Sequence, residues 1–208
     1  MKPGDLAAAL AQLEAGKVVA AATESFFGLL ADIGNPRAVE ALFALKPRGA
    51  DQGVPILLPS TSAWAALVAG EIPGLARAFA TAFWPGPLSI ALASAPDVSP
   101  RVAQGGTLAV RLPGRSAASE LALRWGRPLS ATSANLPGAP PATRSSAVAV
   151  EFAEAVERAD LYVVPGASPG GAPSSVVIVT GNTYRVARVA AVSISALDSI
   201  ANQHTRGA

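Results

Sequence analysis

Two short polar segments carry the residue types best suited to chemistry: Lys46-Pro47-Arg48 and Ser133-Ala134-Asn135. Each lies at the edge of a predicted regular element, where a rigid scaffold presents side chains to a ligand, and we expect both to face one pocket. Lys46 stands out because the chain has only two other lysines. An ammonium and a guanidinium beside hydroxyl and amide groups suit the binding of phosphate or carboxylate. The alternatives are a Lys46 that only offsets a helix dipole, and polar residues that only cap helix ends and loops.

The composition excludes several other kinds of catalytic site. The chain has no cysteine, which rules out disulfides, thiolate metal sites and a cysteine nucleophile. Its one histidine, His204, falls in a polar C-terminal segment that we expect to be a tail, so Ser-His-Asp catalysis and multi-histidine metal sites are not expected. The formal charge of +2 and the pI of about 9.4 permit an anionic ligand or RNA without requiring either.

Neither a signal peptide nor a membrane helix is indicated. Charged residues interrupt the N-terminal apolar stretch, and the longest uncharged windows, 52–70 and 161–184, contain internal proline and glycine. We therefore expect a cytoplasmic protein with no membrane partner.

The periodicity of apolar residues predicts a mixed α/β fold. Helices are expected from an Asp5 cap to Gly16 and over 36–46, 60–69, 73–83, 116–125 and 145–159. Strands are expected over 18–22, 54–58, 88–93, 107–112, 128–131, 161–164, 175–179 and 184–189. We predict one domain over 1–208, with a core at about 6–191, a C-terminal tail at 192–208 and a mobile loop or lid at 165–173.

None of the common phosphate-binding fingerprints occurs in the chain. A nucleotide would instead be held on a concave sheet face, where lysine and arginine neutralise phosphates and serine, threonine and asparagine fix orientation. Six segments then occur in an order typical of one family: Thr23-Glu24-Ser25-Phe26-Phe27-Gly28-Leu29, Lys46-Pro47-Arg48, Phe83-Trp84-Pro85-Gly86-Pro87-Leu88, Leu108-Ala109-Val110-Arg111, Ser133-Ala134-Asn135 and Pro173-Ser174-Ser175-Val176-Val177.

On these segments the chain resembles the YrdC/YciO-like family, from about Leu6 to about Ala191. The resemblance implies a twisted mixed sheet with flanking helices and a concave basic face. It also implies a threonylcarbamoyladenylate synthase, which makes threonylcarbamoyl-AMP and pyrophosphate from threonine, bicarbonate and ATP. Threonylcarbamoyl-transfer proteins would then modify an adenosine of tRNA, while the synthase itself would bind tRNA weakly or indirectly.

The resemblance assigns roles to individual residues. Lys46 and Arg48 would be catalytic, contacting carbamate or phosphate groups. Arg111 would pair bidentately with the threonine carboxylate, since a planar guanidinium matches that geometry; its alternative is a surface ion pair. The family's ATP contacts fall on Arg48, Gln52, Thr107, Asn135, Thr143 and Arg188, and its threonine contacts on Ser25, Arg111, Ser133 and Ser174. The sequence shows no carboxylate cluster for a metal site, so magnesium would arrive on the nucleotide phosphates.

The chain departs from the family pattern mainly on the threonine side. Gly49 replaces an expected proline, and Leu57 and Arg115 stand where many members have histidine. Two other functions therefore stay open: a related nucleotide- or carbamoyl-transfer enzyme with another acceptor, and a non-synthase RNA-binding module of the same fold. The second fits the modest charge poorly, because dedicated RNA binders usually carry denser basic patches.

Overall fold

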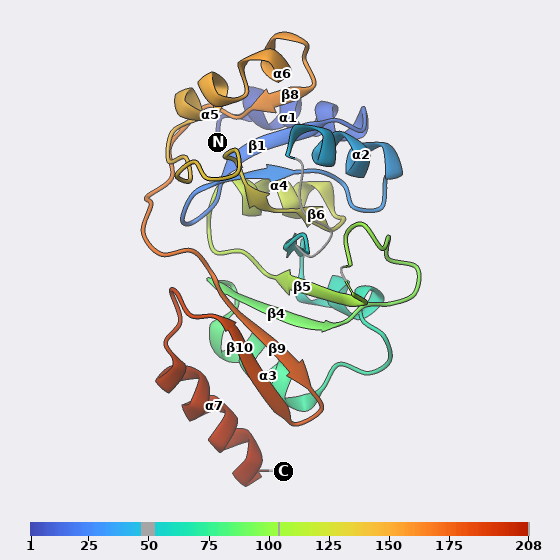
Figure 1. The fold of residues 1–208 in the computed structure, drawn as a ribbon, viewed down its shortest axis with the longest axis vertical. Helices are drawn as coiled ribbons and strands as arrows, with labels where there is room; N and C mark the ends of the chain where they lie inside the picture. The colour runs from blue at the N-terminus through green and yellow to red at the C-terminus, as the bar shows by residue number, and fades with distance from the viewer. Residues whose placement is uncertain (47–52, 104, 208) are drawn as a thin grey trace.

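Two mixed β-sheets form the body of the protein in the computed structural model, which describes residues 1–46, 53–103 and 105–207 (Figure 1). The first sheet has the order β7-β2-β1-β8, with β1 (Val18–Ala22), β2 (Phe27–Leu30), β7 (Thr132–Ser133) and β8 (Leu161–Val163). The second has the order β10-β9-β4-β5-β3-β6, with β3 (Ile56–Leu57), β4 (Leu88–Ala93), β5 (Thr107–Arg111), β6 (Leu129–Ser130), β9 (Ser175–Thr180) and β10 (Thr183–Arg188). The predicted α/β class is confirmed, with the strands divided between two sheets.

The strands pair in both senses, as expected of a mixed fold. β1 pairs antiparallel with β2 and parallel with β8, while β7 pairs antiparallel with β2. In the second sheet β4 and β9 are parallel, as are β3 and β5, and the remaining neighbours are antiparallel. Parallel neighbours need crossover connections, which the helices supply.

Helices cover both faces of the first sheet, and the alternation of β1 side chains explains why. All five residues of β1 are buried: Val18 and Ala20 join one apolar cluster, and Val19 and Ala21 join the other. A strand buried on both faces is a continuous apolar run. In the upper part of Figure 1 the sheet is flanked by α1 (Pro3–Glu14), α2 (Pro36–Leu45), α4 (Ala117–Trp125), α5 (Ser145–Glu151) and α6 (Ala153–Glu157).

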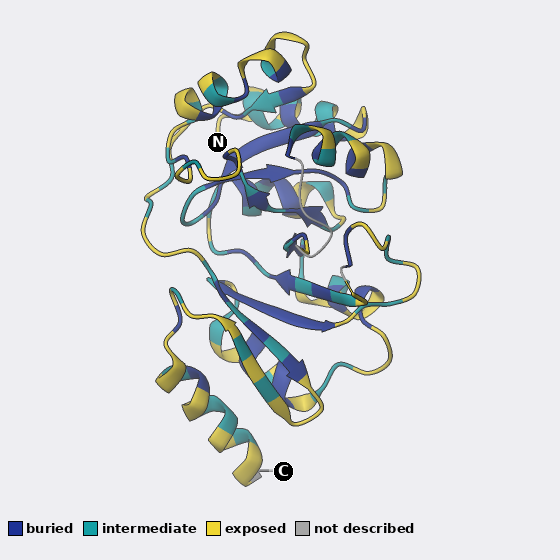
Figure 2. Cartoon of the chain, in the orientation of Figure 1, coloured by how far each residue is buried: buried dark blue, intermediate teal, exposed yellow. Residues whose placement is uncertain are grey.

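The second sheet has a thinner cover. A 3-10 helix, η1 (Thr61–Leu67), α3 (Gly74–Phe83) and α7 (Ile194–Gly207) accompany it in the lower part of Figure 1. Figure 2 shows that β1 and β2 are fully buried whereas β10 is largely exposed. α7 packs against α3, and the predicted tail is therefore wrong. Val192 and Leu197 belong to the core, and His204 lies over Gly74 at the start of α3.

Buried Ser130 joins the two sheets where the chain crosses between them. Its backbone N–H donates to Ala31 O at 2.8 Å, its Oγ accepts from Ala31 N at 2.9 Å, and the same Oγ donates to Leu29 O at 3.1 Å. Ser130 ends β6 in the second sheet, and β7 of the first sheet begins two residues later. These bonds fix how the sheets sit beside each other, and with them the site between the sheets.

Several predicted element bounds differ from the structure. The first helix begins at Pro3 with Lys2 as its N-cap, so the Asp5 cap is wrong, and Asp5 lies in the first turn. The helix expected at 60–69 is the 3-10 helix η1, and the helix expected at 145–159 divides at Phe152 into α5 and α6. Strand β2 was not expected at all. Among the described residues, no helix is both long and apolar enough to cross a membrane.

Candidate functional site

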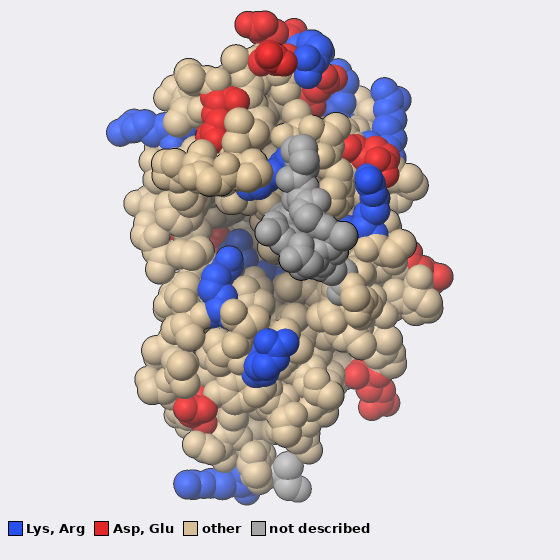
Figure 3. Space-filling view, viewed as in Figure 1, with Lys and Arg blue, Asp and Glu red and all other residues tan. Residues whose placement is uncertain are grey.

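A cavity of about 280 Å³ receives side chains from both sheets and is the candidate site. The first sheet contributes the turn before β2 together with β7, and the second contributes the ends of β5 and β10. Of the residues assigned by the resemblance, five line it: Ser25, Arg111, Ser133, Ser174 and Arg188. Figure 3 shows lysine and arginine side chains around the hollow in the middle of one face, with most acidic side chains towards its edges.

Lys46 and Asn135 do not line the cavity themselves, but Lys46 lies behind it, bonded to the lining residue Ser133. Lys46 follows α2, whose start is fixed by Asn35: the Asn35 side chain caps Arg37 N, and Pro36 occupies the first turn. The Lys46 Nζ donates to Ser133 O at 2.7 Å, to Ser133 Oγ at 3.0 Å and to Asn135 Oδ1 at 3.1 Å. Lys46 is nine-tenths buried. The two segments singled out from the sequence therefore meet through one ammonium group.

Asn135 uses its amide within the protein. Its Oδ1 accepts from Lys46, and its Nδ2 donates to Ala139 O at 2.6 Å and to Leu136 O at 3.2 Å. Because the side chain is buried and bonded on both sides, Asn135 orients Lys46 and ties down the loop at 136–139. A contact between Asn135 and a nucleotide stays a prediction.

Two arginines, Arg111 and Arg188, also line the cavity. Arg111 ends β5 and donates through one terminal nitrogen, Nη1, to Glu24 Oε1. Arg188 ends β10; its Nε donates to Ser174 O at 2.9 Å and its Nη2 to Ser174 Oγ at 3.2 Å. Burial, with a smaller contribution from the charge of Arg188, lowers the pKa of Arg111 to about 10. Arg111 is still a cation at neutral pH.

The turn between β1 and β2 presents Ser25 to the cavity. Thr23 Oγ1 accepts from Ser25 N and Phe26 N, each at 3.2 Å, and donates to Phe26 O at 2.7 Å. Such side-chain bonds close a tight turn. Ser25 O accepts from Gly170 N at 2.8 Å, so this turn is joined to the loop at 165–173.

The loop at 165–173 is anchored along its first half. Ser145 N donates to Gly166 O at 3.0 Å, Gly166 N to Ser145 Oγ at 3.1 Å, and Ser168 N to Thr143 O at 2.8 Å. Thr143 thus lies beside this loop and is not among the residues that line the cavity. The mobility expected of the loop stays a prediction.

Other assigned residues lie elsewhere. Thr107 begins β5, and Arg111 ends it four residues later, about 13 Å away at the usual rise of a strand. The structure does not bring Thr107 to the cavity, and its predicted ATP contact has no support from this geometry. Arg48 and Gln52 lie outside the described residues, as does Gly49.

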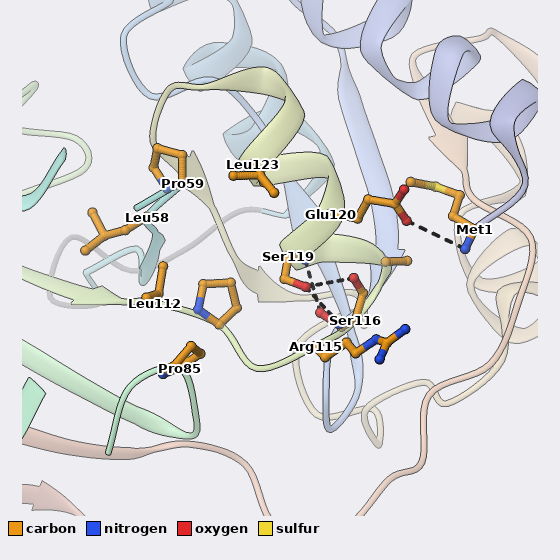
Figure 4. Close-up of a pocket in the computed structure, with 12 residues that line it drawn as sticks. Met1, Leu58, Pro59, Pro85, Leu112, Arg115, Ser116, Ser119, Glu120 and Leu123 are labelled. Atoms are coloured by element: carbon orange, nitrogen blue, oxygen red, sulfur yellow. Dashed lines mark hydrogen bonds and ion pairs between the residues drawn. The ribbon is translucent and has the colours of Figure 1, made fainter. Parts of the chain in front are cut away.

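Leu57 and Arg115, the two positions where many family members have histidine, do not face the cavity. Leu57 is fully buried in β3 against the cluster formed with α1 and α4. Arg115 lines a larger cavity of about 730 Å³, shown in Figure 4, together with Leu58, Pro59, Leu112 and Leu123. Apolar side chains form one wall of that cavity, and none of the residues assigned to ATP or threonine lines it, so we do not place the site there.

One important residue was assigned no role from the sequence. Glu24 stands inside a segment that the resemblance rests on, yet nothing in its neighbours Thr23 and Ser25 indicates a partner. The partner is Arg111, 87 residues away in the sequence. The sequence does carry one signal: Glu24 stands between a buried strand and an apolar run, and a charged residue in such a place usually needs a partner.

Comparison with known proteins gives consistent matches. Residues 11–190 match the family model Sua5_yciO_yrdC, described as "Telomere recombination". The chain is 40% identical over 144 residues to a threonylcarbamoyl-AMP synthase of Pyrococcus abyssi (68% of this chain, 42% of that protein). It is 38% identical over 158 residues to one of Alkalilimnicola ehrlichii (75% and 80%). The crystal structure of P. abyssi Sua5 complexed with L-threonine superposes with a TM-score of 0.84 at 29% identity, covering 96% of this chain and 58% of that one.

Proposed function

Because this chain belongs to the Sua5_yciO_yrdC family, we propose that it is a threonylcarbamoyl-AMP synthase that uses threonine, bicarbonate and ATP. The relatives named for this activity support the assignment, and so does the threonine carried by a protein of similar structure. The observation that carries the proposal is the meeting of three cationic side chains around one small site. Lys46 is held at Ser133, and Ser133 lines the cavity together with Arg111 and Arg188.

The reaction needs such an arrangement. A carbamate oxygen of threonine carbamate attacks the α-phosphorus of ATP, a P–O bond forms, and the bond to the β-phosphate breaks to release pyrophosphate. Negative charge accumulates on the phosphate oxygens, and fixed cations in a partly enclosed site stabilise that charge. Lys46, oriented by Ser133 and Asn135, is suited to contact the phosphate or the carbamate.

Threonine would occupy the Arg111 side of the cavity. A guanidinium binds a carboxylate through parallel N–H bonds, and Arg111 uses only Nη1 within the described protein. Ser25, Ser133 and Ser174 supply hydroxyl groups around it. Arg188, held by Ser174, would contact ATP.

Magnesium would be held by the nucleotide. Among the described residues, no group of three or more acidic or histidine side chains is placed to hold a metal ion. A metal that arrives on ATP would be bound by phosphate oxygens and water. Bound there, it would neutralise charge on the leaving pyrophosphate.

The product is a reactive mixed anhydride, which suits direct delivery to a transferring enzyme. We propose that threonylcarbamoyl-transfer proteins take it to tRNA in the cytoplasm. A small cavity lined by two arginines suits low-molecular-weight anions better than a polynucleotide.

The decisive experiment measures pyrophosphate release with ATP, bicarbonate and threonine, with each omitted in turn. Release that needs all three is expected, with threonylcarbamoyl-AMP as the second product by mass spectrometry. Release that does not need threonine would point to an enzyme with another acceptor. No release under any condition, with retained RNA binding, would support a module without synthase activity.

A further inference from the structure

The ion pair between Glu24 and Arg111 is buried and lies at the edge of the candidate site. The Glu24 side chain is 19% exposed and that of Arg111 is 9% exposed. Removing two charges from water is costly, so a buried pair adds little stability by comparison with apolar residues. At the edge of a binding site, such a pair is better explained by a role in orienting one of its two side chains toward a ligand.

The two partners face different spaces. Arg111 lines the candidate cavity, whereas Glu24 lines a separate cavity of about 340 Å³ with Arg115 and the loop at 165–169. Glu24 therefore approaches Arg111 from the side away from the proposed substrates. It supports the guanidinium and does not itself line the cavity.

Glu24 is itself held firmly. The bonds from Ser25 N and Phe26 N to Thr23 Oγ1 fix the turn that carries it. The segment after β5 packs on its other side, where a Cβ built on Gly114 would lie 3.5 Å from Glu24 Cγ. A support can fix the orientation of another group only if its own position is fixed.

The pair uses one nitrogen and one oxygen, although both groups could offer two. Glu24 Oε1 accepts from Arg111 Nη1, while the buried Glu24 Oε2 has no partner among the described residues. A guanidinium has five N–H donors in one plane. The N–H groups of Arg111 that Glu24 does not bind can therefore donate to a ligand in the candidate cavity.

We infer that Glu24 is a positioning residue for amino-acid binding: it holds Arg111 through Nη1 so that the remaining N–H groups meet the carboxylate of the substrate. The inference rests on the proposed function. A nucleotide, bound mainly through its phosphates, would depend on Glu24 much less.

The test is calorimetric titration of threonine and of a non-hydrolysable ATP analogue into the full chain and its variants. Glu24→Ala should weaken threonine at least tenfold and the ATP analogue less than twofold. Glu24→Gln, which keeps an acceptor oxygen at the same distance, should recover part of the loss. In steady state the KM for threonine should rise while kcat at saturating threonine changes less than threefold, since Glu24 does not contact the reacting atoms.

A matched control is Glu40→Gln, which removes an acid from an exposed pair with Arg101 at 2.5 Å, away from the cavity. It should leave both affinities unchanged.

Equal weakening of threonine and the ATP analogue in Glu24→Ala would overturn the inference. Unchanged threonine affinity in Glu24→Ala would also overturn it, as would a Glu24→Gln variant that binds threonine no better than the alanine variant. If Glu24→Ala does not fold, the same comparison is made with Glu24→Gln alone, where unchanged threonine affinity again overturns it. Failure of the unmodified protein to bind threonine would instead count against the proposed function.

Discussion

Lys46 links two segments of the chain, because its ammonium bonds to Ser133, 87 residues away in the sequence. A counter-charge to the dipole of α2 would remain near the last carbonyl groups of that helix. The Nζ bonds to Ser133 and Asn135 instead place the charge at the cavity. The geometry favours the chemical interpretation of Lys46 over the purely electrostatic one.

Replacing Lys46 with alanine should reduce adenylate formation at least tenfold, because a fixed cation near the transferring phosphate is lost. Buried acceptors on Ser133 and Asn135 would also lose a donor, which costs about 1–3 kcal/mol of stability. Initial rates of pyrophosphate release should be measured well below the melting transition. Lys17→Ala is the control, since Lys17 bonds to Ala159 O in an exposed position. Full turnover in Lys46→Ala would reject the proposed role.

Replacing Arg111 with lysine should weaken threonine much more than ATP. Lysine retains the charge but cannot offer two parallel N–H bonds to a carboxylate. We expect a loss of roughly tenfold or more in threonine affinity, measured by calorimetry with an ATP analogue present. A variant that weakens the ATP analogue and spares threonine would move Arg111 to the nucleotide side.

The sequence predicts which residues line the site better than it predicts their hydrogen-bond partners. Ser25, Arg111, Ser133, Ser174 and Arg188 do line one cavity. The bonds from Lys46 to Ser133 and from Arg111 to Glu24 depend on how distant segments meet, and local patterns carry no such information. Thr107 illustrates the limit, because a threonine at the start of a strand has the same local pattern whether or not it faces a ligand.

At the scale of elements, α7 closes the lower end of the fold. Tyr184 OH donates to Asp198 Oδ1 at 2.5 Å, and the Tyr184 ring meets Phe79 of α3 edge-on at 5.1 Å. Burial and the bond to Asp198 raise the pKa of Tyr184 to about 12. The helix therefore packs onto the fold through one side, with Leu197 buried.

Replacing Leu197 with alanine should lower the free energy of unfolding by about 2–5 kcal/mol, because the Leu197 side chain of α7 is fully buried. Chemical denaturation measures the change. Ile194→Ala in the same helix is the control; Ile194 is 48% exposed, and its loss should cost less than about 1 kcal/mol. Equal effects of the two substitutions would show that α7 does not pack as described.

Element types are predictable here where apolar periodicity is strong, and bounds are not. Pro3 sets the start of α1, and Asp5 therefore lies inside the first turn instead of capping the helix. β2 (Phe27–Leu30) is a buried run of four residues, too short for its periodicity to indicate a strand. α7 has Leu197, Ile200 and Ala201 at helical spacing, but its many polar residues suggest a tail.

At the scale of the whole molecule, charge is sparse and local. The formal charge is +2, and in Figure 3 some basic side chains lie around the hollow while the others are scattered towards the edges, so they form no continuous track on this face. The mixed α/β class follows from the order of apolar runs. Its division into two sheets depends on the crossing at Ser130, and no sequence pattern marks that crossing.

Binding to tRNA should be weak and only mildly sensitive to salt. If Lys46, Arg111 and Arg188 were the only phosphate contacts, the slope of log K against log salt would be about −2 to −3. Filter binding or fluorescence anisotropy at several salt concentrations gives this slope. Tight binding with a slope steeper than about −6, together with no ATP turnover, would favour the RNA-binding module.

The cavity draws its lining from Thr23 at one end of the sequence to Arg188 at the other. A chain emerging from a ribosome at about 5–20 residues per second needs roughly 10–40 s for 208 residues. For about a quarter of that time, between residues 133 and 188 of 208, Lys46 and Ser133 are already made while Arg188 of β10 is not. The cavity therefore cannot have its full lining until β10 has been made, so a nascent chain that stops before Arg188 would lack one of the two arginines that line it.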